Sequence, residues 1–501
     1  MKNITIILTI FTLLIFSGCK KDFLNVNEDP NNTRSASVQM VLPGAMGSTC
    51  YIVGGWYQLL GGFWSQHWTQ ASGAPQWRDI DSYNLTTNDF DSRQYGELYS
   101  GALNDYKYIR KTALAEQNWS YYLIATVMEA YTFQVLADLY DEIPFTDALQ
   151  GDDGNFTPHF NPGQDVYDAL IARIDEALTH DYKTFKSNTS PNATAIEPGN
   201  DDLIFGGNMD NWEAFANTLK LKIYLRQSYV RPAIASAGIQ AMYAANAPFL
   251  ATDAKMTQFA DQENKRNPIY ETGVDRLGGN ISASFTLLNY LQVNADPRLD
   301  AIFDPPAAGG PHKALPQGDF YNPDPTIVNI ANLSTPKLSG LDPVFLISKS
   351  ESYFLQSEAI VRGWGTGSAK TAYDNGISAS LEKFGITGAD SIYGPGSVYA
   401  FPASAPLDTL IKKIIVQKWI ALANSQSLES WIEQGRTHFP ELSPVPTTNA
   451  AYITGQWTVS VNNVTGNKLP KRLLFPESEI KRNPNTPALR PITDKIWWDT
   501  K

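Results

Sequence analysis

The sequence predicts a mostly α-helical protein in which paired helices form a TPR-like scaffold that carries an irregular, loop-rich lobe. The first observation is that apolar residues recur at helical spacing in several segments, and these segments follow one another in pairs. Stacked helix pairs of this kind bury their apolar faces against their neighbours. The second observation is that residues 250–345 contain many Gly and Pro residues and show little periodicity, and loops of this length tend to be functional.

The first 36 residues are expected to address and anchor the chain. Lys2 precedes an apolar run over residues 4–16, which is shorter than the ~20 residues that a membrane-spanning helix needs. In "LLIFSGCKKD" a small pair stands directly before Cys19, which is typical of a lipoprotein signal. Residues 1–18 are therefore predicted to be removed, and residues 19–36 to form a tether that acyl chains on Cys19 hold on a membrane. The alternative is an ordinary signal peptide with an incidental cysteine.

Residues 37–501 are expected to fold as one domain, with the loop-rich insertion at about 250–345. Helices are predicted over residues 95–117, 119–140, 165–181, 212–229, 350–364, 369–384, 407–422 and 427–435. Within the second of these, Leu123, Val127 and Met128 belong to an apolar stripe, and Pro144 brings the pattern to an end. Strand patterns are weak, and "QWTVSVN" is a short candidate.

The charge balance argues against one class of partner, and the cysteine count limits disulfide formation. The chain has 39 Lys and Arg against 51 Asp and Glu, which argues against nucleic-acid binding, because that needs a concentrated basic patch. If Cys19 is acylated, Cys50 has no intramolecular partner and no disulfide is possible. We therefore expect Cys50 to be a reduced, buried thiol.

No catalytic, cofactor or metal site is predicted. The sequence lacks the common motifs of serine nucleophiles, zinc proteases and nucleotide-binding loops, and its five His residues are scattered. Asp79, Asp81, Asp89 and Asp91 lie close together, and they could form a glycosidase pair, a calcium site or a solvated acidic loop. The solvated loop is favoured, because a calcium site needs more oxygen ligands in a fixed order.

The main candidate for a ligand surface is the aromatic stretch "GGWYQLLGGFWSQHWTQASGAPQWRDIDSYNL" over residues 54–85. Trp56 and Trp64 are expected to pack into the scaffold, and Trp68, four residues after Trp64, is a further ligand candidate. Trp77 follows "ASGAP", which favours a loop, so its indole is expected to be a surface platform for a sugar ring. The alternative is that Trp77 packs in the core.

Three neighbours of Trp77 complete this candidate site. Arg78, Asp79 and Tyr83 carry groups that can hydrogen-bond sugar hydroxyls around an aromatic platform. A second candidate is "QENKRNPIYETGVDR" over residues 262–276, where Asn267 and Tyr270 could face the first stretch. For Asn267 an ordinary structural turn before Pro268 is the favoured interpretation, and a ligand contact is the other.

Seven stretches carry a family resemblance by their joint order along the chain. They are "DFLNVNEDPNN", "YTFQVLADLYDEIPFTDAL", "NWEAFANTLKLKIYLR", "SYFLQSEAIVRGW", "AYDNGISASLEKFGI", "SLESWIEQGRTHFPEL" and "RLLFPESEIKRNPN". From Cys19 to about residue 485 the chain resembles the SusD/RagB family of outer-membrane lipoproteins, and in particular its second SusD-like branch. The resemblance implies TPR-like helix pairs and a role as the surface lid of a SusC-type, TonB-dependent transporter in a Bacteroidota-type cell. Such lids bind a glycan or, in some members, a peptide.

The anchor signal, the ordered stretches and the aromatic segment lead to one functional expectation. The chain is expected to be a lipoprotein, lipid-anchored in the outer membrane and facing the exterior, that captures an oligosaccharide and delivers it to the transporter without catalysis. One alternative keeps the transporter and replaces the glycan by a peptide, since aromatic grooves also hold peptides. Others are a surface glycoside hydrolase and a helical scaffold that binds only protein.

Overall fold

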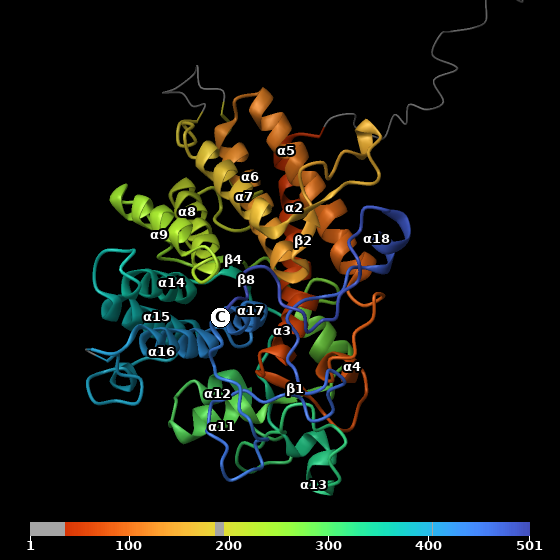
Figure 1. Ribbon diagram of the computed structural model, residues 1–501, viewed down its shortest axis with the longest axis vertical. Helices are drawn as coiled ribbons and strands as arrows, with labels where there is room; N and C mark the ends of the chain where they lie inside the picture. The colour runs from red at the N-terminus through yellow and green to blue at the C-terminus, as the bar shows by residue number, and fades with distance from the viewer. Residues whose placement is uncertain (1–35, 186–194, 403) are drawn as a thin grey trace, which may run out of the picture.

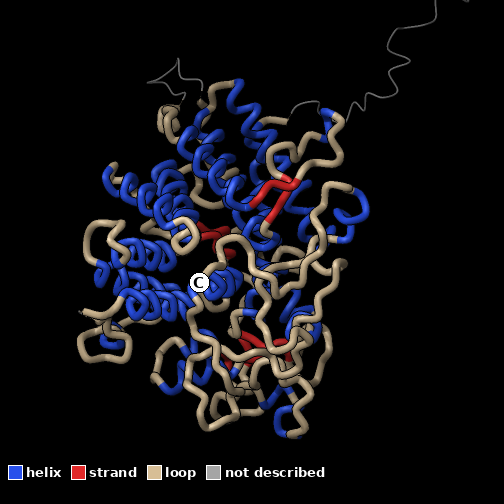
Figure 2. The backbone as a smooth tube through the Cα atoms, viewed as in Figure 1, coloured by secondary structure: helices blue, strands red, loops and turns tan. Residues whose placement is uncertain are grey.

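The computed structural model describes residues 36–185, 195–402 and 404–501. The predicted signal peptide, Cys19 and nearly all of the tether lie outside the described residues. Helices dominate the fold, and the strands are short and occur in pairs (Figure 2). The prediction of a mostly α-helical protein is therefore confirmed.

Every helix predicted from periodicity is present. These helices are α5 (Asn104–Ala115), α6 (Trp119–Tyr140), α7 (Gly163–Ala177), α8 (Met209–Arg226), α14 (Lys349–Val361), α15 (Ala369–Lys383), α16 (Leu407–Ala421) and α17 (Ser427–Thr437). Two π-helical segments, Asp91–Gly96 and Leu98–Leu103, lead into α5 and account for the earlier start of its apolar pattern.

The prediction missed four longer helices and several short ones. The longer ones are α2 (Val38–Ile52), α3 (Gln58–Trp64), α9 (Pro232–Ala244) and α11 (Phe285–Val293). The short ones are α4 (Arg78–Asp81), α10 (Pro268–Tyr270), α12 (Leu299–Ile302), α13 (Pro325–Val328) and α18 (Glu477–Arg482). Pro43 inside α2 and the glycines on either side of its end weaken the helical pattern, which is why sequence alone did not reveal α2 and α3.

Successive helices pack against each other as pairs. Helices α5, α6 and α7 lie at one end of the molecule, α14, α15 and α16 lie along one side, and α11, α12 and α13 lie at the other end (Figure 1). Close approach depends on glycine at two contacts. A Cβ on Gly376 of α15 would lie 2.7 Å from the Phe354 ring of α14, and one on Gly61 of α3 would lie 2.1 Å from the Leu428 nitrogen of α17.

Helix α6 lies at the centre of this packing. All of its side chains except that of Trp119 are buried, because α2, α5, α7 and α8 all contact it. The helix ends where Asp141 adopts a φ of 73°, and the chain continues into β2 (Glu142–Pro144), so the predicted stop before Pro144 is confirmed.

The strands join segments that are far apart in the sequence. The pairs are β1 (Trp68–Gln70) with β5 (Ile281–Ala283), β2 with β3 (Phe160–Pro162), β4 (Ala254–Met256) with β8 (Val344–Ile347), and β6 (Phe303–Asp304) with β7 (Thr335–Pro336). In the first pair Trp68 lies opposite Ala283 and Gln70 opposite Ile281. This pairing holds the aromatic stretch of residues 54–85 against the loop-rich lobe.

A buried network of charged side chains connects the helices. Its basic members are Lys222 and Arg226 of α8, Lys418 of α16 and Arg436 of α17, and its acidic members are Asp138, Glu351, Glu358, Glu429 and Glu433. Burial alone would raise the pKa of Glu429, but Arg226, Lys222 and Lys418 outweigh it and lower this pKa to about 2. Glu429 is therefore ionised and paired with these cations inside the scaffold.

Cys50 is a free, fully buried thiol on α2, as predicted. Burial raises the pKa of the Cys50 thiol to about 12, so it stays protonated at neutral pH. Within the described residues, the helices are all too short or too polar to cross a membrane.

Candidate functional site

Asp81 holds the aromatic stretch in place. Its carboxylate is buried at the end of α4 and accepts hydrogen bonds from the Thr69 hydroxyl and the Gln70 amide, both at 2.8 Å, and from the Gln317 side chain. Burial raises the pKa of Asp81 to about 6, and these hydrogen bonds act in the opposite direction. The contacts join β1, α4 and the lobe segment at residue 317, so Asp81 is a positioning residue and part of neither a solvated loop nor an acidic cluster.

The expectation that Trp77 is an exposed platform is wrong. Its side chain is 3% exposed, and its ring lies 6.4 Å from that of Phe63. The loop signal was correct, because residues 71–77 form turns between β1 and α4, but the loop turns the indole inward onto α3. Trp77 is one of the residues that line a cavity of ≈ 360 Å³, together with Trp56, Gln76, Asp79 and Asp89.

Trp68 and Tyr83 are buried as well. Trp68 is inaccessible to solvent and donates its indole N–H to Asn424 Oδ1 at 2.9 Å. The Tyr83 hydroxyl accepts from the Ser460 amide at 3.2 Å, and its ring meets that of Trp64 edge-on. Trp64 is buried, as expected, and Trp56 is half-buried. The described contacts of Trp68 and Tyr83 are those of scaffold residues.

Asn267 has the structural role that the alternative reading favoured. Its side chain caps α10 by accepting from the Ile269 and Tyr270 amides, and it donates to the Asp342 carbonyl at 2.9 Å. Asn267 is buried and Tyr270 is half-buried. Among the described residues, no hydrogen bond or ring contact joins either of them to residues 72–83.

Within the aromatic stretch, Arg78 and Asp79 are the two predicted ligand residues that reach the surface. Asp79 is exposed and accepts from the Asn84 side chain at 3.1 Å. The Arg78 guanidinium is half-buried, donates to the Ser72 carbonyl at 3.0 Å and lies 4.8 Å from the centre of the Tyr321 ring. Tyr321 is 66% exposed and its neighbour Phe320 is buried beneath Arg78. We name Arg78, Phe320 and Tyr321 the Arg78–Tyr321 platform.

Tyr321 was missed by the sequence reading. The signal was present in "YNPDP", where Pro and Asn predict a loop after an aromatic residue. What the sequence could not show is that this loop of the lobe lies beside residues 72–78. The contact follows from the β1–β5 pairing and from the Asp81 hydrogen bonds, which join positions more than 200 residues apart.

The loop around the platform carries polar atoms that have no hydrogen-bond partner among the described residues. They are the Ser72 hydroxyl, the Trp77 indole N–H and the Arg78 Nε–H. Buried donors of this kind are normally paired, so they favour a polar ligand or water at this place. The exposed Tyr321 ring beside this loop can stack on the C–H face of a sugar.

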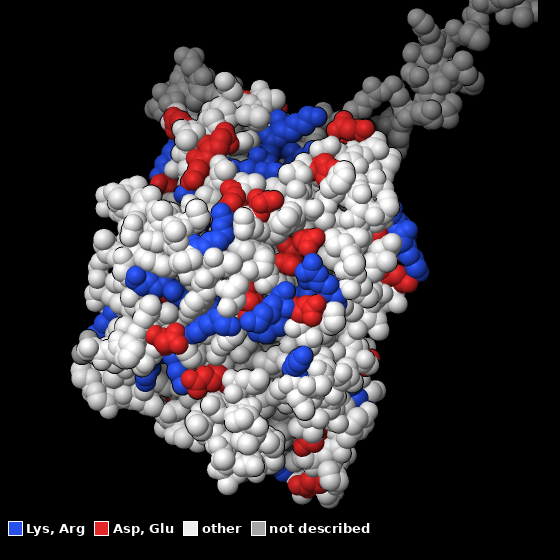
Figure 3. All heavy atoms as spheres, viewed as in Figure 1, with Lys and Arg blue, Asp and Glu red and all other residues white. Residues whose placement is uncertain are grey.

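The surface charge also fits a neutral ligand here. Figure 3 shows Lys and Arg mixed with Asp and Glu over the helical part of this face, whereas the end that carries α11, α12 and α13 is mainly uncharged. Tyr321 and the exposed Val328 belong to the chain at and just before α13. A large electrostatic attraction for a strongly charged polymer is therefore absent from the visible face around α13.

Comparison with known proteins identifies relatives along nearly the whole chain. Residues 31–460 match the model of the family SusD-like_2, described as "Starch-binding associating with outer membrane". No curated protein matches the chain significantly. Among solved structures, the chain resembles a SusD homologue from Bacteroides uniformis, with 22% identity and a TM-score of 0.72 over 92% of this chain and 99% of that one.

Two further structures carry printed descriptions of their ligands. A chitin-binding SusD homologue from Flavobacterium johnsoniae has 19% identity and a TM-score of 0.74, over 92% of this chain and 98% of that one. A structure described as a chitin-binding protein has 23% identity and a TM-score of 0.72, over 93% of this chain and all of that one. At these identities, the likeness to each structure is one of fold.

Proposed function

The chain belongs to the SusD-like family, whose model spans most of its length, and from this premise we propose that it captures an oligosaccharide at the cell surface. It delivers this ligand to a SusC-type, TonB-dependent transporter of the outer membrane and does not cleave it. The family description refers to starch and to the outer membrane, and two structural relatives are described as chitin-binding. These descriptions support a glycan as the ligand class.

The observation that carries the proposal is the Arg78–Tyr321 platform. The Tyr321 ring packs on Phe320 and lies 4.8 Å from the Arg78 guanidinium, yet it is 66% exposed, so it presents an aromatic surface to solvent beside a hydrogen-bond donor. A sugar can use both groups, because its C–H face stacks on the Tyr321 ring and its hydroxyls accept from the Arg78 guanidinium.

Tyr321→Ala is expected to weaken oligosaccharide binding roughly tenfold or more, because aromatic stacking contributes about 1 kcal/mol or more beyond area burial and about 1.4 kcal/mol is a factor of ten. The exposed position predicts a change in unfolding free energy within about 0.5 kcal/mol. A glycan array selects the oligosaccharide, and calorimetry measures its affinity for the wild type and for Tyr321→Ala.

The matched control is Phe156→Ala, because Phe156 is also an exposed aromatic residue, at 77%, on a different loop. It should leave affinity and stability unchanged. If wild type and Tyr321→Ala bind the oligosaccharide with equal affinity, the Arg78–Tyr321 platform is not part of the binding site. If the protein binds peptides but no oligosaccharide, the ligand is a peptide and the glycan proposal is wrong.

Cys19→Ala is expected to release the protein from the membrane while leaving the fold intact, because the acyl chains supply the attachment and Cys19 lies outside the described fold. Membrane fractionation checks the first expectation, and thermal melting of the released protein checks the second. A variant that still pellets with outer membranes would contradict anchoring through Cys19.

A further inference from the structure

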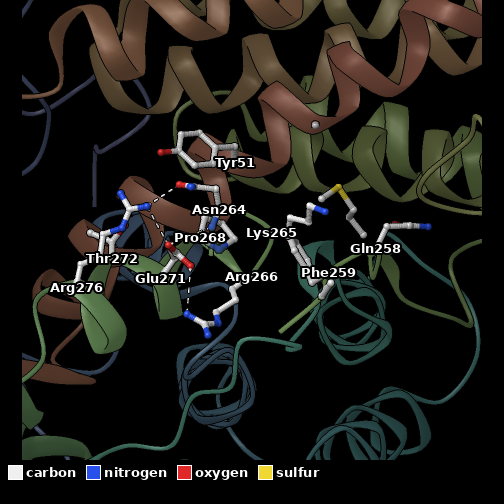
Figure 4. A pocket seen from close by; sticks show the side chains of 13 residues that line it. Tyr51, Gln258, Phe259, Asn264, Lys265, Arg266, Pro268, Glu271, Thr272 and Arg276 are labelled. Carbon is white, nitrogen blue, oxygen red and sulfur yellow. Dashed lines mark hydrogen bonds and ion pairs between the residues drawn. The ribbon is translucent and has the colours of Figure 1, made fainter. Parts of the chain in front are cut away.

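A second cavity opens between α2 and residues 256–276, and it shares no lining residue with the Arg78–Tyr321 platform. Its volume is ≈ 570 Å³, which falls in the range of about 300–1,000 Å³ that is usual for small-ligand sites. Gly47 and Tyr51 of α2 form one side, and the loop and π-helical segment that follow β4 form the other (Figure 4). The cavity therefore lies where the helical scaffold meets the loop-rich lobe.

An aromatic ring is available on the α2 side. Tyr51 is 53% exposed although it belongs to a helix whose other large side chains are mostly buried. Phe259, half-buried, lines the cavity from the lobe. Figure 4 shows the Tyr51 ring above Asn264 and Pro268.

A buried carboxylate lines the cavity, and one of its oxygens has no hydrogen-bond donor among the described residues. Glu271 is 7% exposed, and its Oε1 accepts from Arg276 Nη2 at 2.9 Å and from the Asn264 amide at 3.3 Å. Its Oε2 has no hydrogen-bond partner among the described residues and is paired only by charge with Arg266, whose Nη1 lies 3.9 Å away (Figure 4). A buried carboxylate oxygen without a donor is costly, so this atom indicates a ligand that supplies one.

The charges around Glu271 define which donor fits. Lys265, Arg266 and Arg276 all line the cavity, and although Asp261, Asp275 and Glu263 offset part of this charge by pairing with the two arginines, three cations beside Glu271 disfavour a metal ion or an amine there. The buried carboxylate in turn disfavours an anion at the same place. A neutral hydroxyl can donate to Glu271 Oε2 without being repelled by the cations or by the carboxylate.

We infer that this cavity is a second carbohydrate subsite that takes one pyranose ring of an oligosaccharide. The C–H face of the ring lies on Tyr51, and a ring hydroxyl donates to Glu271 Oε2. The inference rests on the proposed function, because it assigns a second place to the same class of ligand. The π-helical segment Glu271–Arg276 is followed by β5, which pairs with β1, so one continuous segment of the lobe leads from this cavity to the strand before the platform loop.

The chain offers a matched pair of variants for the test. Gly47 lines the cavity, and a Cβ added there meets no atom within 4 Å, so Gly47→Phe fills the cavity without a backbone clash. Gly44 lies on the same helix, is equally unobstructed and does not line the cavity, so Gly44→Phe controls for the new side chain. Each variant is placed in the full chain that already carries Tyr321→Ala, which disables the platform.

The probes are N-acetylchitotriose, maltotriose and the glycans that an array selects, and equilibrium dialysis measures their binding. Tyr321→Ala alone is expected to keep one binding site, Gly44→Phe to leave that site unchanged, and Gly47→Phe to weaken it roughly tenfold or more. Tyr51→Ala, a substitution of an exposed side chain, should reproduce the loss if Gly47→Phe fails to fold.

The inference is overturned if the Gly47→Phe and Tyr51→Ala double variants bind as tightly as the Gly44→Phe one, or if Tyr321→Ala alone binds nothing. In both cases the wild type still binds, so the proposed function stands. Absence of glycan binding by the wild type overturns both proposals together.

Discussion

Arg436→Ala is expected to lower the free energy of unfolding by about 3–5 kcal/mol, because it leaves buried carboxylates without their counter-ion. Arg436 is inaccessible to solvent and donates to Glu358 at 2.7 and 2.6 Å and to Glu433 at 2.9 and 2.6 Å. It also donates to the Leu225 carbonyl and to Ser228, and so joins α17 to α14 and to the end of α8. Denaturant titration of the variant measures the loss.

The control is Arg231→Ala, which removes another two-pronged arginine–carboxylate pair, at 2.9 and 3.0 Å to Asp168. The Asp168 side chain is 46% exposed, so this pair should contribute about 1 kcal/mol or less. A similar loss for the two variants would show that burial of the Arg436 network is unimportant.

The same network predicts how the stability loss depends on pH. Burial alone would raise the pKa of Glu358 and of Glu433, but the cations around them, with Arg436 the strongest, together outweigh it and lower both below the usual value of 4.5. A lowered carboxyl pKa contributes stability above the unfolded-state pKa and loses it as the pH falls through the folded-state pKa. The difference between wild type and Arg436→Ala should therefore be largest near neutral pH and shrink as the pH falls below about 4.5.

Trp77→Ala is the second large expected effect, at about 3–5 kcal/mol of unfolding free energy, which is usual for a buried tryptophan truncated to alanine. The indole is 3% exposed and packs on Phe63, so truncation leaves a cavity under the loop that carries the platform. Thermal and denaturant unfolding measure the loss. Tyr321→Ala, at the exposed ring of the same site, is the comparison and should change stability little. A loss below about 1 kcal/mol for Trp77→Ala would show that the indole is not a core residue.

The helical scaffold could largely be predicted from the sequence, because each helix carries its own apolar stripe. Residues 119–140 show this most clearly, since helix α6 begins and ends where the pattern does. Helix α2 could not be predicted in the same way. Pro43 and its glycines weaken the local pattern, and the helix is stabilised by contacts with α5 and α6 that are distant in the sequence.

The candidate site was predictable in part. Arg78 and Asp79 are at the surface, as expected, whereas Trp68, Trp77 and Tyr83 are buried. The residue types in the sequence identified a stretch rich in aromatic and polar side chains. The direction in which each ring points depends on the residues that pack against it. Phe63 covers Trp77, Asn424 accepts from Trp68 and Ser460 donates to Tyr83. None of these partners can be deduced from local spacing.

The sequence by itself determined the helical class, the family and the segment in which the platform begins, because these follow from periodicity and from the order of motifs along one chain. Only the tertiary structure decided that Tyr321 is the exposed ring, that Arg78 lies beside it, and that Glu271 Oε2 has no hydrogen-bond donor in the cavity that Tyr51 also lines. The physical reason is that burial and unpaired donors or acceptors are properties of neighbours in space. Here those neighbours are brought together by strand pairs and hydrogen bonds between positions some two hundred residues apart.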